Sequence, residues 1–297
     1  AYYPGCSLHS TGIEYDISTR KVCGAMGIEL AEVKDWICCG ATPAHQCDEL
    51  MSVALPAKNL VLAQNTDNLK ELCVPCASCY SRLKSAQERL KDEGLRRDVE
   101  EIIDSEYPED VRVLHMLDMI VEKVGTDTIK EKVVRRLDGF KVACYYGCLM
   151  TRPPKVTGKQ QFENPTDMES VMEVLGAEPI DWNMKTFCCG ASFALTQTDV
   201  VLELTRKILA DADLAGAQAI SVGCPLCHAN LDGRQQQINE KFNTNFNIPI
   251  FYFTELMGLA LGIEAQDLGI FKHLNCGKRL TYGGQQFQLT FSYHLDA

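Results

Sequence analysis

The segment Cys38-Cys39-Gly40-Ala41 occurs a second time as Cys188-Cys189-Gly190-Ala191, 150 positions further along the chain. Two more cysteine motifs repeat around this segment in the same order. They are Tyr3-Pro4-Gly5-Cys6 with Tyr146-Gly147-Cys148, at an offset of 142, and Cys76-Ala77-Ser78-Cys79 with Cys224-Pro225-Leu226-Cys227, at an offset of 148. Three motifs kept in one order at nearly one offset indicate an internal duplication.

The segments between these motifs also repeat. Apolar residues have helical spacing over 49–66 and 199–216, and each of these segments leads into a short β-type run, over 72–75 and 219–222. Each run ends at a Cys-x-x-Cys motif, and a further helix-like segment follows. Strands that alternate with helices favour an α/β fold, with sites beyond the carboxyl ends of parallel strands.

We therefore predict an α/β fold made of two tandem cysteine-rich domains, each with a small, mainly parallel sheet and flanking helices. The first covers residues 1–138 and the second 139–273. Segment 111–125 resembles 250–262, which predicts a matching strand and helix at the end of each half. The tail, residues 274–297, has no counterpart, and we assign it no role.

Composition limits the possible partners. The 297 residues carry a formal charge of -11, and an acidic chain repels nucleic acid unless its basic residues gather on one face. We expect no nucleic-acid partner. No run reaches the roughly 18–20 apolar residues of a membrane span. Since no secretory leader is visible, we expect a cytoplasmic protein, in which clustered thiols are metal ligands or redox groups.

Each half supplies five repeated thiols. They are Cys6, Cys38, Cys39, Cys76 and Cys79 in the first half, and Cys148, Cys188, Cys189, Cys224 and Cys227 in the second. A structural zinc site uses four ligands, and adjacent cysteines suit it poorly because consecutive side chains on extended backbone point in opposite directions. Five thiols suit a core with several iron atoms, which predicts one iron–sulfur cluster in each half.

The other five cysteines do not follow the repeat. Cys73 corresponds to Ser221 and Cys144 to Tyr2, so neither has a repeated partner. We expect Cys144 to be a buried strand residue. Cys23, Cys47 and Cys276 are isolated, and we expect them to be small apolar residues in or near the core.

A Cys-Cys-Gly segment followed by Cys-x-x-Cys, present twice in one chain, resembles the cysteine-rich domain of the heterodisulfide reductase family. With Tyr145-Tyr146-Gly147-Cys148 ahead of Arg152-Pro153, residues 1–273 are similar to the disulfide-reducing subunit of that family. The resemblance implies two noncubane [4Fe-4S] clusters held by the ten repeated cysteines. It also implies reduction of the coenzyme M–coenzyme B heterodisulfide between the clusters, in a complex of anaerobic energy metabolism.

The resemblance implies partners and substrate contacts as well. Electrons would come from two further heterodisulfide reductase subunits, one ferredoxin-like and one flavin-containing, with a hydrogenase or formate dehydrogenase as donor. The substrate carries anionic groups, which cationic or hydrogen-bonding residues would bind. Residues of this kind lie near the repeated cysteines. They are Arg152, Lys155, His9 and His228, although packing roles are favoured for the two histidines.

Two other interpretations stay open. The first is an iron–sulfur electron-relay subunit of a glycolate or lactate oxidase, or of a succinate or fumarate-type enzyme. Such chains usually have an attached ferredoxin-like domain, and its closely spaced cysteines do not occur in this sequence. The second is a zinc-stabilised scaffold without redox activity, which would be colourless and free of sulfide.

Overall fold

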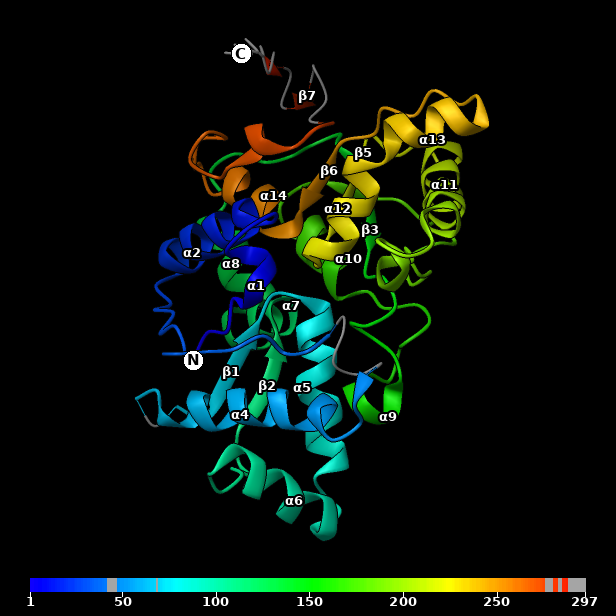
Figure 1. Cartoon of the computed structure of the whole chain (residues 1–297). Helices are drawn as coiled ribbons and strands as arrows, with labels where there is room; N and C mark the ends of the chain where they lie inside the picture. The colour runs from blue at the N-terminus through cyan, green and yellow to red at the C-terminus, as the bar shows by residue number, and fades with distance from the viewer. Residues whose placement is uncertain (42–46, 68, 276–279, 283–284, 288–297) are drawn as a thin grey trace, which may run out of the picture.

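The computed structural model describes residues 1–41, 47–67, 69–275, 280–282 and 285–287. It is a mixed α/β structure in which helices surround two small parallel sheets (Figure 1). β1 (Glu71–Val74) pairs with β2 (Arg112–His115) in the first sheet. The second sheet has the order β4-β3-β5-β6. Its strands are β3 (Lys141–Tyr145), β4 (Glu178–Pro179), β5 (Ala219–Val222) and β6 (Ile250–Tyr252). The predicted fold class is confirmed.

The two sheets follow one plan. Val74 lies opposite His115 in the first sheet, as Val222 lies opposite Tyr252 in the second. Tyr2 makes isolated parallel bridges to Cys73 and Glu32, and so takes the place that β3 has between β5 and β4. The first half therefore has only a bridge where the second half has the strand β3. Pro4 has no N–H to donate, so regular pairing cannot continue beyond it.

Helices follow the strands in both halves. Those of the first half are α1 (Gly5–Leu8), α2 (Ile13–Met26), α4 (Met51–Asn65), α5 (Ala77–Arg89), α6 (Glu93–Ile103), α7 (Met116–Met119) and α8 (Thr126–Lys132), with a π-helical turn over Ile120–Val124. Those of the second half are α9 (Pro154–Thr157), α10 (Asp167–Val174), α11 (Thr198–Leu214), α12 (Pro225–Gly233), α13 (Gln235–Phe242) and α14 (Phe253–Ala260). The helix-like segment predicted after the second Cys-x-x-Cys motif is two helices, because α12 ends at Gly233 and α13 begins at Gln235.

The strand and helix predicted at the end of each half are confirmed. β2 leads directly into α7, and β6 leads directly into α14. In the tail, the backbone of β7 (Leu280–Tyr282) pairs antiparallel with β8 (Gln285–Phe287). Within the described residues, no helix is both long and apolar enough to cross a membrane.

Helices of each half pack against helices of the other half. α2 of the first half packs against α14 of the second, while α10 of the second half packs against α8 of the first (Figure 1). α9 likewise packs against α5. One apolar core therefore runs through both sheets, and a smaller one lies between α4, α5 and α6. The domain boundary between residues 138 and 139 therefore stays a prediction that rests on the sequence repeat.

The contact between α2 and α14 contains a buried hydroxyl pair, with Ser18 Oγ 2.7 Å from Thr254 Oγ1. We expect Ser18→Ala to lower the free energy of unfolding by about 1–3 kcal/mol, because it leaves a buried hydroxyl without this partner. The double change Ser18→Ala with Thr254→Val should recover most of that loss, since no hydroxyl is then left unpaired. Urea unfolding of the variants measures this. Equal losses in the single and double variants would contradict it.

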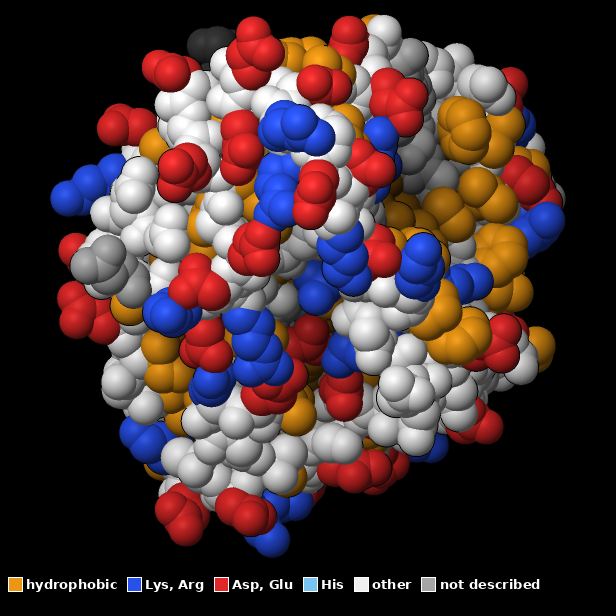
Figure 2. Space-filling view, turned by 90° about the horizontal axis from the view of Figure 1, so that it is seen from below, with side chains coloured by type: hydrophobic (Ala, Val, Ile, Leu, Met, Phe, Trp, Pro, Cys, Tyr) orange, Lys and Arg blue, Asp and Glu red, His pale blue; other side chains and the backbone are white. Residues whose placement is uncertain are grey.

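The surface mixes charges of both signs. Figure 2 shows acidic and basic side chains interspersed on the face seen from below, so basic residues are not segregated there. The expectation that nucleic acid is not a partner stays a prediction from composition.

Candidate functional site

The repeated cysteines lie at the carboxyl ends of the parallel strands. Cys76 follows β1 and caps the start of α5, and Cys224 follows β5 and caps the start of α12. Cys148 comes shortly after β3, while Cys6 follows the bridge at Tyr2. These cysteines thus lie at the edge of each sheet where the sites were predicted, and their role as ligands stays a prediction.

Thiols come into contact within each half. Cys39 Sγ lies 3.2 Å from Cys79 Sγ in the first half, and Cys189 Sγ lies 3.4 Å from Cys227 Sγ in the second. Cys148 Sγ is 3.8 Å from Cys188 Sγ. All fourteen cysteines that the structure describes are free thiols.

The two thiol groups also meet each other. Cys76 of the first half interacts through its thiol with Cys224 of the second. Both side chains are almost fully buried. The sites are therefore adjacent, and an electron or a small molecule could pass from one to the other over a short distance.

Backbone geometry around the thiols is the same in both halves. Gly5 (φ 71°) and Gly147 (φ 64°) lie in the left-handed region, and a Cβ atom at either would stand 3.1 Å from Cys79 Sγ or Cys227 Sγ. The Gly40 N–H donates to Cys38 Sγ at 3.4 Å, as Gly190 does to Cys188 Sγ at 3.3 Å. Backbone therefore approaches the thiols closely in both halves, which glycine permits because it has no Cβ.

Neighbouring thiols shift one another's pKa in opposite directions. Hydrogen bonds from Cys38 and Cys79 keep the pKa of Cys39 well below its usual range, while the hydrogen bond to Cys39 raises the pKa of Cys79. In the second half, the hydrogen bond from Cys148 lowers the pKa of Cys188 to about 6. Adjacent thiolates repel one another, so a positively charged core would favour the ionised form of these neighbouring thiols.

A crevice opens on these thiols between the halves. From the first half it is lined by Ala41, Ala77 and Ser78. The second half contributes Cys148, Cys188, Cys189, Cys224 and Cys227, together with Tyr146, Leu149, Ala191, Ser192 and Leu226. A small molecule in this space would touch both repeats.

Comparison with known proteins agrees with the repeat. A family model described as CCG, a cysteine-rich domain, matches residues 1–84 and 142–232, one segment in each half. The chain belongs to the CCG cysteine-rich domain family. The two matched segments contain all ten repeated cysteines of this CCG protein.

Relatives in two enzyme classes match nearly the whole CCG chain. The 8-methylmenaquinol:fumarate reductase membrane anchor subunit of Wolinella succinogenes is 31% identical, over 91% of this chain and 94% of its own. A ferredoxin/F(420)H(2)-dependent CoB-CoM heterodisulfide reductase subunit of Methanosarcina acetivorans is 28% identical, over 90% of this chain and 91% of its own. The resemblance to a heterodisulfide reductase subunit is confirmed.

A solved structure shares the fold. The crystal structure of a hypothetical protein from Helicobacter pylori superimposes with a TM-score of 0.71 at 13% sequence identity. The match covers 92% of this chain and 52% of that one. At this identity the likeness concerns the fold alone.

The cysteines outside the repeat have mostly the expected places in the CCG fold. Cys144 lies in β3 and is fully buried, and Cys23 and Cys73 are buried as well. Burial raises the pKa of Cys23 to about 12, which keeps this thiol protonated. The prediction for Cys47 is wrong, because its side chain is exposed just ahead of α4. Cys276 lies outside the described residues.

The four polar residues predicted to contact substrate occupy different settings. Arg152 donates to the carbonyl of Thr186 and lies close enough to Cys188 to favour its thiolate. Lys155 is exposed, 3.7 Å from Glu88. His9 packs edge-on against Trp36. His228 is buried, and its Nε2 lies 3.2 Å from the Ile250 carbonyl oxygen. Their substrate contacts stay predictions, with Arg152 the best placed.

Sequence reasoning missed one cation near the thiols. Arg82 is partly buried in α5, and its charge helps to lower the pKa of Cys39. It comes three residues after Cys79, so the two side chains share a face of the helix. That spacing is the signal that could have identified Arg82.

The close approach of Gly147 to Cys227 gives a matched test. Gly147→Ala and Gly139→Ala both place a Cβ at positive φ, but only the first crowds a thiol, because nothing lies within 4 Å of a Cβ at Gly139. We expect both variants to lose about 1–2 kcal/mol of stability. Only Gly147→Ala should also lose iron, measured per chain after anaerobic purification. Equal iron in the two variants would contradict this.

Proposed function

We propose that the chain is an oxidoreductase subunit of the heterodisulfide reductase type, which reduces a disulfide in the crevice between its halves. The single observation that carries the proposal is the meeting of two five-thiol groups, through Cys76 and Cys224, beside a crevice lined by both halves. A disulfide has two sulfur atoms that must each be stabilised as a thiolate when the bond breaks. Two adjacent sites can do this.

The thiols fit one iron–sulfur cluster in each half. In each group, free thiols approach to within 3.2–3.8 Å around backbone that two glycines bring close. When bound, two noncubane [4Fe-4S] clusters would supply the two electrons of disulfide reduction, one from each. The five thiolates of each half would hold them in place, and Ala41, Ala77 and Ser78 line the crevice beside them.

The chain's own residues would position an anionic substrate. Arg152 stands at the second thiol group and Arg82 at the first, so positive charge lies beside each site. A molecule with an anionic group on each side of a central disulfide would bind between them. The coenzyme M–coenzyme B heterodisulfide has this form, and we propose it as the substrate.

The proposal includes partner proteins. We expect two further heterodisulfide reductase subunits, one ferredoxin-like and one flavin-containing, to deliver electrons in the cytoplasm, with a hydrogenase or formate dehydrogenase as the donor. Relatives named as heterodisulfide reductase subunits support a multi-subunit assembly.

One comparison supports a second candidate function. The fumarate reductase subunit of Wolinella succinogenes is 31% identical and matches over 94% of its own length. That relative has almost the same extent as this chain, so the length of the match does not separate the two functions. The second candidate is an electron-relay subunit of a quinol:fumarate reductase, which would carry the clusters without reducing a disulfide.

One assay separates the two candidates. The chain is purified anaerobically, iron and sulfide are measured, and oxidation of reduced viologen is followed with and without the coenzyme heterodisulfide. We expect about eight irons per chain and dye oxidation that depends on the disulfide. Full iron content without disulfide-dependent oxidation would overturn the proposal and favour the relay. Zinc without sulfide would support the scaffold interpretation.

A further inference from the structure

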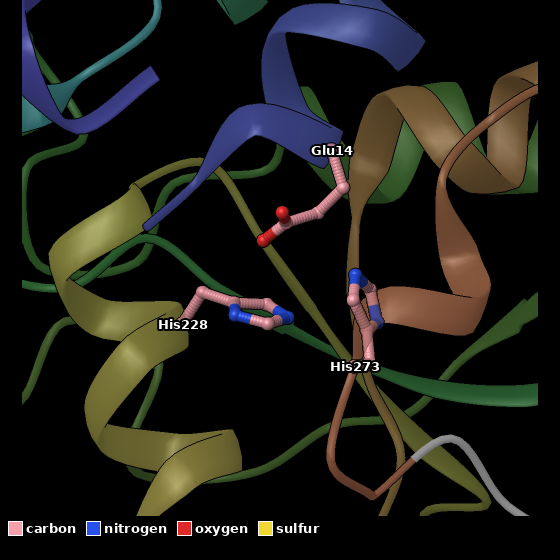
Figure 3. Close-up of side chains that lie close together, drawn as sticks. All are labelled: Glu14, His228 and His273. Atoms are coloured by element: carbon pink, nitrogen blue, oxygen red, sulfur yellow. The ribbon is translucent and has the colours of Figure 1, made fainter. Parts of the chain in front are cut away.

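A second cluster of potential metal ligands lies outside the thiol crevice. Glu14 is in the first turn of α2, His228 is in α12, and His273 follows the 3-10 turn Ile270–Lys272. The three residues are 5%, 4% and 2% exposed, and one ligand atom from each lies within 4.8 Å of the others. Figure 3 shows the carboxylate and the two imidazole rings directed toward a common space.

The fold brings these distant residues together through close packing. Gly269 (φ 82°) allows its chain segment to pass α2 so closely that a Cβ there would lie 2.9 Å from Glu14 Cβ. The chain then reaches His273. Just beyond it, the N–H groups of Leu274 and Asn275 donate to the Asp232 carboxylate at 2.7 and 2.9 Å. His273 is thus fixed from both sides.

Aromatic stacking fixes His228. Its ring lies flat on Tyr252, with centroids 4.5 Å apart, and Tyr252 stacks in turn on Tyr15, the neighbour of Glu14, at 4.2 Å. Rings held in this way lose little freedom when they bind a ligand. This arrangement is independent of the thiol groups, although His228 directly follows Cys227.

Each histidine ring has a polar neighbour at Nε2. His228 Nε2 lies 3.2 Å from the carbonyl oxygen of Ile250, and His273 Nε2 lies 3.0 Å from Glu255 Oε1. Both contacts are made by Nε2 and fix the orientation of the two rings.

The charge of the region favours a cation. Glu14 and Glu255 are buried carboxylates, and Asp232 adds a third negative charge close to them. Positive charge near Glu14 comes from His273 and from the exposed Lys272. Burying carboxylates is costly without compensation, and a divalent ion would compensate two of these charges at once.

We propose that Glu14, His228 and His273 form a binding site for one divalent transition-metal ion, with zinc as the ion that suits this donor set. Two imidazoles and one carboxylate are established zinc ligands. The ion would link α2 of the first half to α12 of the second, next to a thiol of the crevice, and would anchor the chain where it enters the tail. Its role would be structural, separate from electron transfer.

The test uses the full chain, purified anaerobically with its iron, supplied with zinc and then desalted. We expect about one zinc per chain, with nitrogen and oxygen scatterers at roughly 2.0–2.1 Å in zinc K-edge absorption and no sulfur shell near 2.3 Å. The iron of the thiol sites does not contribute to this edge. The spectrum of the unaltered protein decides the ligand type even where a variant fails to fold.

Two variants complete the test. Glu14→Gln should lower bound zinc at least about tenfold while iron per chain stays constant, because glutamine keeps the size of glutamate but loses the anionic donor. Glu203→Gln, half-exposed on α11, is the matched control and should keep its zinc. Zinc with a sulfur shell, zinc equal in Glu14→Gln and the control, or no zinc in iron-loaded protein would each overturn the proposal. None of these results bears on disulfide reduction.

Discussion

Replacing Cys189 with serine is expected to lower the iron content from about eight to about four atoms per chain. Cys189 Sγ lies 3.4 Å from Cys227 Sγ inside the second thiol group, and the first group has its own five thiols. Cys39→Ser should have the same effect in the first half, and the double variant should hold almost no iron. Anaerobic iron and sulfide analysis measures all three.

Cys144→Ala is the control for this experiment. Cys144 is fully buried in β3, outside the repeated set, so its loss should cost stability and leave the iron content unchanged. Iron lost equally in Cys144→Ala and Cys189→Ser would mean that iron content reports folding rather than ligation. Full iron in Cys189→Ser would remove this residue from the ligand set.

Blocking the crevice is expected to abolish disulfide reduction while leaving the thiol groups intact. Ser192 is exposed and lines the crevice near Cys188, so tryptophan at this position would fill the space without disturbing the core. We expect Ser192→Trp to keep its iron and to lose disulfide-dependent viologen oxidation about 100-fold or more, because a displaced substrate cannot reach both sites.

Ala215→Trp is the matched control, since Ala215 is exposed at the end of α11 and does not line the crevice. It should retain both iron and activity. Ser192→Trp with full activity would show that the disulfide reacts elsewhere. An electron-relay subunit would give no disulfide-dependent oxidation in any variant, so the experiment also separates the two candidate functions.

Much of the architecture can be predicted because its signals are local or repeated. The strand expected over 219–222 is β5, and the helical segment 199–216 agrees with α11 (Thr198–Leu214) to within two residues at either end. Boundaries are less accurate where one residue overrides a pattern. Pro4 limits the first half to a bridge where the second half has β3, and the helix-like segment after the second Cys-x-x-Cys motif breaks at Gly233. The prediction for Cys47 fails because an isolated cysteine carries no information about its burial.

The sequence by itself determined the expected thiol chemistry, because the ten cysteines repeat in order with their glycines. A repeated spacing of this kind can be recognised without knowing how the chain packs. Only the tertiary structure decided that Cys76 meets Cys224, that α2 packs on the other half, and that Glu14 faces His228 and His273. These contacts join residues 148 to 259 positions apart. Periodicity reports which face of an element is buried, whereas the partner of that face depends on how the whole chain packs.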